Sequence, residues 1–331
     1  MPASLRPPPP DPRSIHGALR AGLTALILSV AAGGALAQTA ATAPAGAPAP
    51  DPAAGPAEAA PKPFPLTDSG RLLATGGVSQ VEGAAGGGLV PWAVIAGYGT
   101  RDAVGASVHD TGIFLRDYSL NSVGAALGFY DRLELSYDHI FFDTRSTGRL
   151  LGLGKGFTFD ENILGAKVRL LGDAVYDQDS WLPQLGLGLQ YKRTDDTAIL
   201  KSVGAHTNDG TDFYLAATKL LLEQSLLLNA TLRATRANQL GILGFGGPKS
   251  NGYKPEFEGS AAFLFSRELA LGAEYRTKPS NLSFREENAY DLFLAYFFTK
   301  NVALTLAYVD LGAIATRNNE NGAYLSLQIG F

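Results

Sequence analysis

Apolar residues recur at every second position through most of the chain between residues 70 and 331. The last segment shows this clearly, because one of its faces is apolar and the other is mostly polar or small. The apolar face holds Leu325, Leu327, Ile329 and Phe331, and the other face holds Tyr324, Ser326, Gln328 and Gly330. A spacing of two is that of a β-strand whose two faces meet different surroundings. The pattern therefore predicts an all-β fold.

About fourteen such segments can be counted, beginning with two near residues 71–82 and 90–99. The glycine-rich stretch 71–88 is the weakest of the predicted strands, so twelve strands is the alternative count. Short turns, such as those at 130–132 and 299–301, alternate with long polar or glycine-rich connections. The long connections lie at about 143–160, 194–211, 236–255, 277–288 and 311–321. This asymmetry predicts a transmembrane antiparallel up-and-down β-barrel of about 14 strands with both termini in the periplasm.

Composition excludes several other classes of protein. Hydrophobic residues make up 46% of the chain and charged residues 18%, with a mean hydropathy of +0.04. No stretch after the N-terminal region offers the roughly 20 apolar residues that a membrane-spanning helix needs. A barrel reconciles these observations, since it shows apolar residues to lipid and keeps polar residues inside. The absence of cysteine excludes a disulfide framework and a thiolate metal site.

The N-terminal region has the order of a secretory signal peptide. A basic stretch at Arg13–Arg20 precedes an apolar stretch at Ala21–Ala32. The small residues Ala35 and Ala37 then form an A-x-A cleavage site immediately before Gln38. We therefore expect residues 1–37 to be removed during export.

The exported chain then divides into a linker and a barrel. Residues 38–67 consist largely of alanine, proline, threonine and glycine, and such a segment buries too little apolar area to offset its ordering entropy. We expect a disordered periplasmic linker there and the barrel at 68–331. Without the signal peptide the chain has 24 basic and 30 acidic residues, a formal charge of −6. This balance argues against a nucleic-acid partner.

Two stretches carry a family resemblance. The C-terminal alternation at Leu325, Leu327, Ile329 and Phe331 resembles the signal by which the barrel-assembly machinery recognises outer-membrane barrels. The segment from about residue 70, including Gly88–Gly99, resembles a domain-of-unknown-function family of proteobacterial outer-membrane proteins. The resemblance implies a barrel in the lipid of the outer membrane of a Gram-negative cell. It implies no substrate and transfers no catalytic residue.

Charged residues on the predicted inner faces are the candidates for function. They are Glu134, Asp138, Lys167, Arg169, Lys192, Arg233, Glu258, Glu274, Arg276 and Asp291. Charges of both signs suit a hydrated path, and they equally suit mutual neutralisation inside a closed lumen. The leading hypothesis is a passive or facilitated channel for a small solute. The alternative is a closed structural or interaction barrel that presents its loops or its proline-rich arm to a partner.

An outer-membrane hydrolase is the third hypothesis, and the sequence offers it little. Ser107 and His109 share one face of a predicted strand, and His206 lies in a loop close to Asp209 and Asp212. Nucleophilic catalysis needs a base and an orienting group beside the nucleophile, and neither set supplies all three. We therefore predict no enzyme activity, no cofactor and no metal site.

Two of the long connections are unusually apolar for surface loops. Loop 143–160 contains an apolar run at 150–157, and loop 236–255 contains Leu240, Ile242, Leu243 and Phe245. We interpret loop 143–160 as an inward constriction and loop 236–255 as an inward or lipid-touching loop. The alternative for both loops is a packed cap over the mouth of the barrel.

Overall fold

The computed structural model describes Arg71, Gly76 and residues 78–331. The predicted signal peptide and linker lie outside the described residues, including the cleavage site at Ala35, Ala37 and Gln38.

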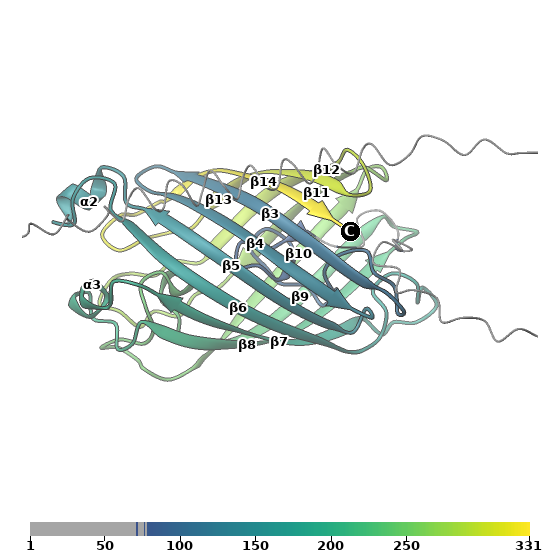
Figure 1. The fold of residues 1–331 in the computed structure, drawn as a ribbon, viewed down its shortest axis with the longest axis horizontal. Helices are drawn as coiled ribbons and strands as arrows, with labels where there is room; N and C mark the ends of the chain where they lie inside the picture. The colour runs from purple at the N-terminus through teal and green to yellow at the C-terminus, as the bar shows by residue number, and fades with distance from the viewer. Residues whose placement is uncertain (1–70, 72–75, 77) are drawn as a thin grey trace, which may run out of the picture. The chain divides into compact units, whose positions relative to one another are not determined.

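Twelve antiparallel strands form a closed barrel, because the last strand pairs with the first strand of the wall (Figure 1). The wall strands are β3 (Val104–Leu115), β4 (Ser119–Phe129), β5 (Leu133–Asp143), β6 (Thr158–Leu171), β7 (Gln184–Thr194), β8 (Asp209–Leu221), β9 (Leu226–Thr235), β10 (Lys254–Leu264), β11 (Leu269–Arg276), β12 (Ala289–Phe297), β13 (Val302–Asp310) and β14 (Asn321–Gly330). Each strand pairs with its neighbours in the chain, as in an up-and-down barrel.

The twelve-strand alternative is the count that the structure shows. The segments predicted as strands at 71–82 and 90–99 do not join the wall. The first of these segments contains the two-residue strand β1 (Val78–Ser79). It pairs in antiparallel fashion with a second two-residue strand, β2 (Ala85–Gly86). Both faces of this stretch are buried, so its alternating pattern did not reflect a wall between lipid and lumen.

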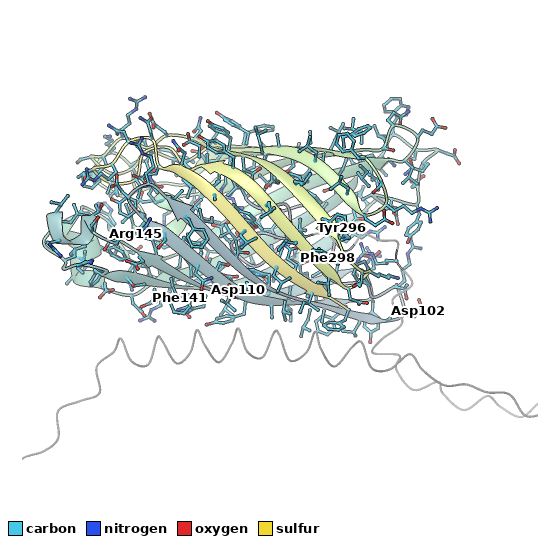
Figure 2. All side chains as sticks on the ribbon, turned by 90° about the horizontal axis from the view of Figure 1, so that it is seen from above. Asp102, Asp110, Phe141, Arg145, Tyr296 and Phe298 are labelled. Carbon is cyan, nitrogen blue, oxygen red and sulfur yellow. The ribbon has the colours of Figure 1, made fainter. Side chains whose placement is uncertain are left out.

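Side chains alternate between the two sides of the wall. Along β12, Asp291 and Phe293 are buried, whereas Leu292 and Leu294 are 58% and 38% exposed. Tyr296 and Phe298 continue the exposed row, with ring centroids 4.9 Å apart (Figure 2). Similar rows of exposed leucine, phenylalanine and tyrosine occur on the other strands. Apolar surface on this scale belongs against lipid, so the protein is an outer-membrane β-barrel.

The two ends of the barrel differ (Figure 1). The end that we call the short-turn end carries the turns at 130–132, 222–225, 265–268 and 298–301, a longer connection at 172–183, and Phe331. The end that we call the long-loop end carries the connections 144–157 with α2 (Thr147–Leu150), 195–208 with α3 (Thr197–Ser202), 236–253 with η1 (Gln239–Gly241), 277–288 and 311–320. Among the described residues, no helix has both the length and the hydropathy to cross a membrane.

Candidate functional site: the lumen and the segment that fills it

The lumen is occupied by residues 78–99, which we call the lumen segment. Every residue of this segment is buried. Its backbone bonds to side chains around the circumference: the amide of Ala93 donates to Thr218 Oγ1 of β8 at 2.7 Å, and the amide of Ala96 donates to Glu134 Oε2 of β5 at 2.8 Å. Trp92 Nε1 donates to Ser260 Oγ of β10 at 3.0 Å. The segment is thus fastened to widely separated strands.

The composition of the lumen segment explains why it fits a polar lumen. It is rich in glycine and alanine, and Glu82 is its one charged residue. Small residues let backbone approach backbone closely. A Cβ atom added to Gly128 of β4, for example, would overlap the carbonyl oxygen of Ala96. The main-chain amides and carbonyls of the segment can therefore reach polar side chains of the wall and form hydrogen bonds with them.

Glu82 lies in a cluster of three basic side chains, which we call the Glu82 cradle. Arg276 of β11 donates to both carboxylate oxygens, with Nη1–Oε2 2.8 Å and Nη2–Oε1 3.1 Å. Lys192 of β7 forms an ion pair with Oε1, and Arg233 Nη2 of β9 lies 3.7 Å from Oε2. All four side chains are almost completely buried. Gln80 Nε2 adds a further bond to Oε2 at 2.6 Å.

Two acidic side chains of the wall complete the cradle. Glu258 Oε1 accepts from Arg233 Nε at 2.5 Å and lies 3.1 Å from Arg276 Nε. Asp212 Oδ2 lies 2.8 Å from Lys192 Nζ and 3.4 Å from Arg233 Nη1. The wall alone therefore places three positive and two negative charges in the cradle. Glu82 supplies the third negative charge, and the cluster becomes neutral.

A second buried ion pair, formed between β5 and β6, also holds the segment. Lys167 Nζ and Glu134 Oε2 lie 3.1 Å apart on the paired strands β6 and β5. Lys167 also donates to the carbonyl oxygens of Ala85 and Trp92, at 3.0 and 3.1 Å. Glu134 accepts from the amides of Ala85 and Ala96. Both charges are thus satisfied partly by the lumen segment.

All ten candidate lumen residues are buried in the structure. Six of them, Glu134, Lys167, Lys192, Arg233, Glu274 and Arg276, bond or pair directly with the lumen segment. Glu258 belongs to the cradle through the two arginines. The remaining three, Asp138, Arg169 and Asp291, have other surroundings.

Arg169 belongs to the short-turn end. It pairs with Asp131 and Asp173 and donates to the carbonyl oxygen of Gly172 at 3.0 Å. Together with Arg101 and Arg132 it lines an open hollow of about 570 Å³. Asp291 lies opposite Glu274 in the register of β11 and β12. Neither carboxylate oxygen of Asp291 has a hydrogen-bond partner among the described residues.

The sequence did not single out Glu82 or Asp212 as lumen residues. Glu82 ended a predicted wall strand, and Asp212 was grouped with the loop around His206. In the structure Asp212 lies on β8 and faces inward. A sole charge in a long neutral, glycine-rich stretch was the available signal for Glu82.

The 236–253 connection covers the lumen at the long-loop end. Leu240, Ile242, Leu243 and Phe245 are all buried, as a packed cap requires. This cap reaches the cradle, because Lys192 Nζ donates to the carbonyl oxygen of Leu240 at 2.9 Å. Loop 144–157 behaves differently: Leu150 is 73% exposed, and the loop gives no inward constriction at that position.

The groups proposed for hydrolysis are not arranged for it. His109 Nε2 lies 2.9 Å from Asp138 Oδ2 and 3.1 Å from Ser122 Oγ, so both neighbours meet the same ring nitrogen. His109 Nδ1 has no partner among the described residues, whereas a Ser-His-Asp triad uses both nitrogens. Ser107 is not in this cluster. Asp209 Oδ2 accepts a hydrogen bond from the Tyr191 hydroxyl at 3.2 Å. In the described part of the chain, no group of three or more His, Cys, Asp or Glu residues could hold a metal ion.

Cavities beside the lumen segment and under the cap are small. One of about 40 Å³ lies beside Val78 and Trp92, one of about 20 Å³ beside Ser79 and Gln328, and one of about 10 Å³ beneath Leu240. Each has room for about one or two water molecules. The described residues 78–99, all of them buried, occupy the lumen between these cavities.

The residues of the predicted assembly signal lie on β14 and just after it. Leu325 is exposed, Leu327 is half-buried and Ile329 is buried. The main chain of Phe331 pairs with Ala106, with N–O distances of 2.8 and 3.0 Å. These positions describe the final barrel, and recognition by the assembly machinery stays a prediction.

Several solved structures are similar to this chain in fold. The KdgM porin is similar over 68% of this chain and 99% of its own, at 11% identity and a TM-score of 0.45. The COG4313 outer membrane channel from Pseudomonas putida F1 covers 73% and 96%, at 13% identity and a TM-score of 0.43. Outer membrane phospholipase A from Escherichia coli covers 71% and 94%, at 10% identity and a TM-score of 0.37.

No curated protein matches the sequence. A family model described as "Protein of unknown function (DUF3034)" matches residues 75–328 and confirms the family resemblance. The chain belongs to this family, DUF3034.

Proposed function

We propose that this protein is a gated outer-membrane channel for a small solute, and that the lumen segment closes it at rest. The observation that carries the proposal is the set of polar bonds between segment and wall, which accompany an apolar contact made by residues such as Val78 and Trp92. Glu82 and the main chain of residues 85–96 meet charged and hydroxyl side chains of the wall. Water can replace each of these hydrogen bonds when the segment leaves the lumen, so the polar part of the contact does not hold the segment permanently.

The connection of the segment to the barrel also supports this function. Residues 78–99 precede β3, so the segment is joined to the wall only at its C-terminal end. It can leave the lumen without breaking the barrel. Signal-directed export through residues 1–37 and a periplasmic linker at 38–67 complete the proposal, and they place the short-turn end in the periplasm.

A closed structural barrel is the second candidate, because the lumen is covered twice. The lumen segment fills its middle, and the buried Leu240–Phe245 stretch covers its long-loop end. In a barrel that serves only to present its loops, the lumen segment and the Leu240–Phe245 stretch would stay in place permanently.

Planar-bilayer conductance separates the two candidates. We expect the chain lacking residues 78–99 to show a large, steady conductance and the intact chain to show a small or intermittent one. Heat-modifiable migration in gels confirms that each variant is folded. A folded deletion variant that does not conduct would overturn the channel and establish the closed barrel.

A disulfide lock provides a matched control. The chain has no cysteine, and a Cβ atom added to Gly186 of β7 would lie 3.4 Å from the Cβ of Ala93. This separation is close to that of a disulfide. Ala93→Cys/Gly186→Cys should therefore suppress the intermittent conductance when oxidised and restore it when reduced. Each single cysteine variant should respond to neither treatment.

A further inference from the structure

The wall of the Glu82 cradle carries one more positive than negative charge. Lys192, Arg233 and Arg276 face Asp212 and Glu258, and the lumen segment provides the missing negative charge. When the segment leaves, the excess positive charge of the wall remains in the lumen and attracts an anion. We propose that the cradle is a binding site for a monocarboxylate solute, and that Glu82 occupies it as an internal substitute for that solute.

The geometry around Glu82 is that of carboxylate recognition. Two nitrogens of Arg276 meet the two carboxylate oxygens in a forked contact, the arrangement in which arginine binds carboxylates best. Lys192 adds a second charge from a different strand. Since the bonds come from side chains of β7, β9 and β11, the site remains in the wall after Glu82 departs.

The acidic residues of the cradle set the class of ligand. Asp212 and Glu258 balance two of the three positive charges, so a monoanion restores neutrality and a dianion exceeds it. Glu161 is buried on β6 near Lys192 but has no hydrogen-bond partner among the described residues. An ionised carboxylate buried without such a partner is costly, so the neutral form of Glu161 is favoured. The site thus fits small carboxylic acids, such as a uronic, keto or hydroxy acid.

The same geometry gives the solute a way to open the barrel. A carboxylate that takes the place of Glu82 removes the charged anchor of the lumen segment. The claim that this carboxylate is the transported solute rests on the proposed channel. The binding site itself can be tested without conductance.

Trp92 provides a readout inside the lumen. The chain has two tryptophans, and Trp181 is 95% exposed at the short-turn end. Trp181→Phe therefore leaves Trp92, which bonds to Ser260, as the sole reporter of the segment. Its quenching by acrylamide measures how far the segment is released.

The test compares Glu82 and Glu82→Ala in the Trp181→Phe protein. Acetate and glucuronate are titrated at constant ionic strength, with chloride and glucose as controls. With Glu82 present, carboxylates should compete with it and raise the quenching of Trp92. In Glu82→Ala, quenching should start high and fall as a carboxylate fills the cradle. A carboxylate that changes Trp92 quenching in opposite directions in the two proteins must act at the site that Glu82 occupies. A general solvent effect would change the quenching in the same direction in both.

Two further variants locate the site. Arg276→Gln in the Glu82→Ala protein should weaken the carboxylate effect about tenfold or more, as expected when a charge-assisted bond is lost. Glu161→Gln should leave it unchanged. Rescue by glucose or chloride as strong as by acetate, or no rescue by acetate and glucuronate, would overturn the inference. Failure of the deletion variant to conduct would instead overturn the channel and leave the carboxylate site standing.

Discussion

The amide of Tyr98 donates a hydrogen bond to the carbonyl oxygen of Phe331 at 2.7 Å. This bond joins the end of the lumen segment to the residue that follows β14. The amide of Ala106 on β3 donates to the same oxygen at 3.0 Å. Phe331 therefore contacts both the strand that closes the barrel and the segment that fills it.

Deleting Phe331 should reduce assembly in cells far more than it reduces the stability of the refolded barrel. The folded structure loses the main-chain bonds to Tyr98 and Ala106 and the contacts of one half-buried side chain, whereas the resemblance to an assembly signal implies that the terminal aromatic is needed for recognition. Folded yield in outer membranes and in detergent should be measured for both chains. An unchanged cellular yield would contradict the predicted signal.

Leu294→Arg should lower the free energy of unfolding by about 2 to 4 kcal/mol if this position lies near the bilayer midplane. Leu294 is exposed on the outer face of β12, where lipid would surround a charge. Asp291→Asn should be tolerated, because Asp291 faces inward and its carboxylate has no hydrogen-bond partner among the described residues. Urea unfolding in vesicles tests both. Equal losses would contradict this assignment of the two faces.

The wall strands were predictable because lipid and lumen impose opposite demands on successive residues. Leu292, Leu294 and Tyr296 alternate with inward residues, and this pattern survives in the sequence without any knowledge of the partner strands. The inward charges followed from the same alternation. Lys192 and Arg233, for example, fall on the inward positions of their strands when every second residue is assigned to the lumen.

The lumen segment was not predictable in this way. Val90, Trp92 and Val94 recur at every second position, so the stretch resembles a strand with an apolar face. In the structure its partners are side chains from distant parts of the chain, such as Thr218 and Ser260. Periodicity carries no information about such partners. The pairing of Glu82 with Arg276, 194 residues away, appears only once the barrel is closed.

Gly128→Ala should loosen the lumen segment. The added Cβ would overlap the carbonyl oxygen of Ala96, so the segment must move away from β4. Quenching of Trp92 in the Trp181→Phe protein should rise, and so should conductance in planar bilayers. Gly259→Ala on β10 is the matched control, because its nearest neighbour would be a Phe257 ring atom at 3.4 Å. Similar quenching in both variants would contradict the close approach at Gly128.

The cap at the long-loop end should loosen as the pH rises from 5 to 7.5. Burial raises the pKa of Glu286 to about 7, although the positive charge of Lys278 acts in the opposite direction. Glu286 accepts a hydrogen bond from Gln239 Nε2 at 2.6 Å and so touches the 236–253 connection. A carboxyl whose folded pKa exceeds its unfolded value of about 4.5 gives stability below that value and loses it as the pH passes 7. Lys278, whose pKa burial lowers to about 8, stays largely protonated through this window and contributes little change.

Hydrogen exchange of the amides at 241–245 measures this effect directly. Exchange, corrected for its intrinsic pH dependence, should be faster at pH 7.5 than at pH 5. Glu286→Gln should remove most of the difference, because a neutral amide does not titrate. Glu320 in the 311–320 connection has a pKa that burial also raises to about 7, so a residual change of the same sign should persist until Glu320→Gln is added. Exchange that is slower at pH 7.5, or a full pH response in the double variant, would show that these two carboxyl groups do not control the cap.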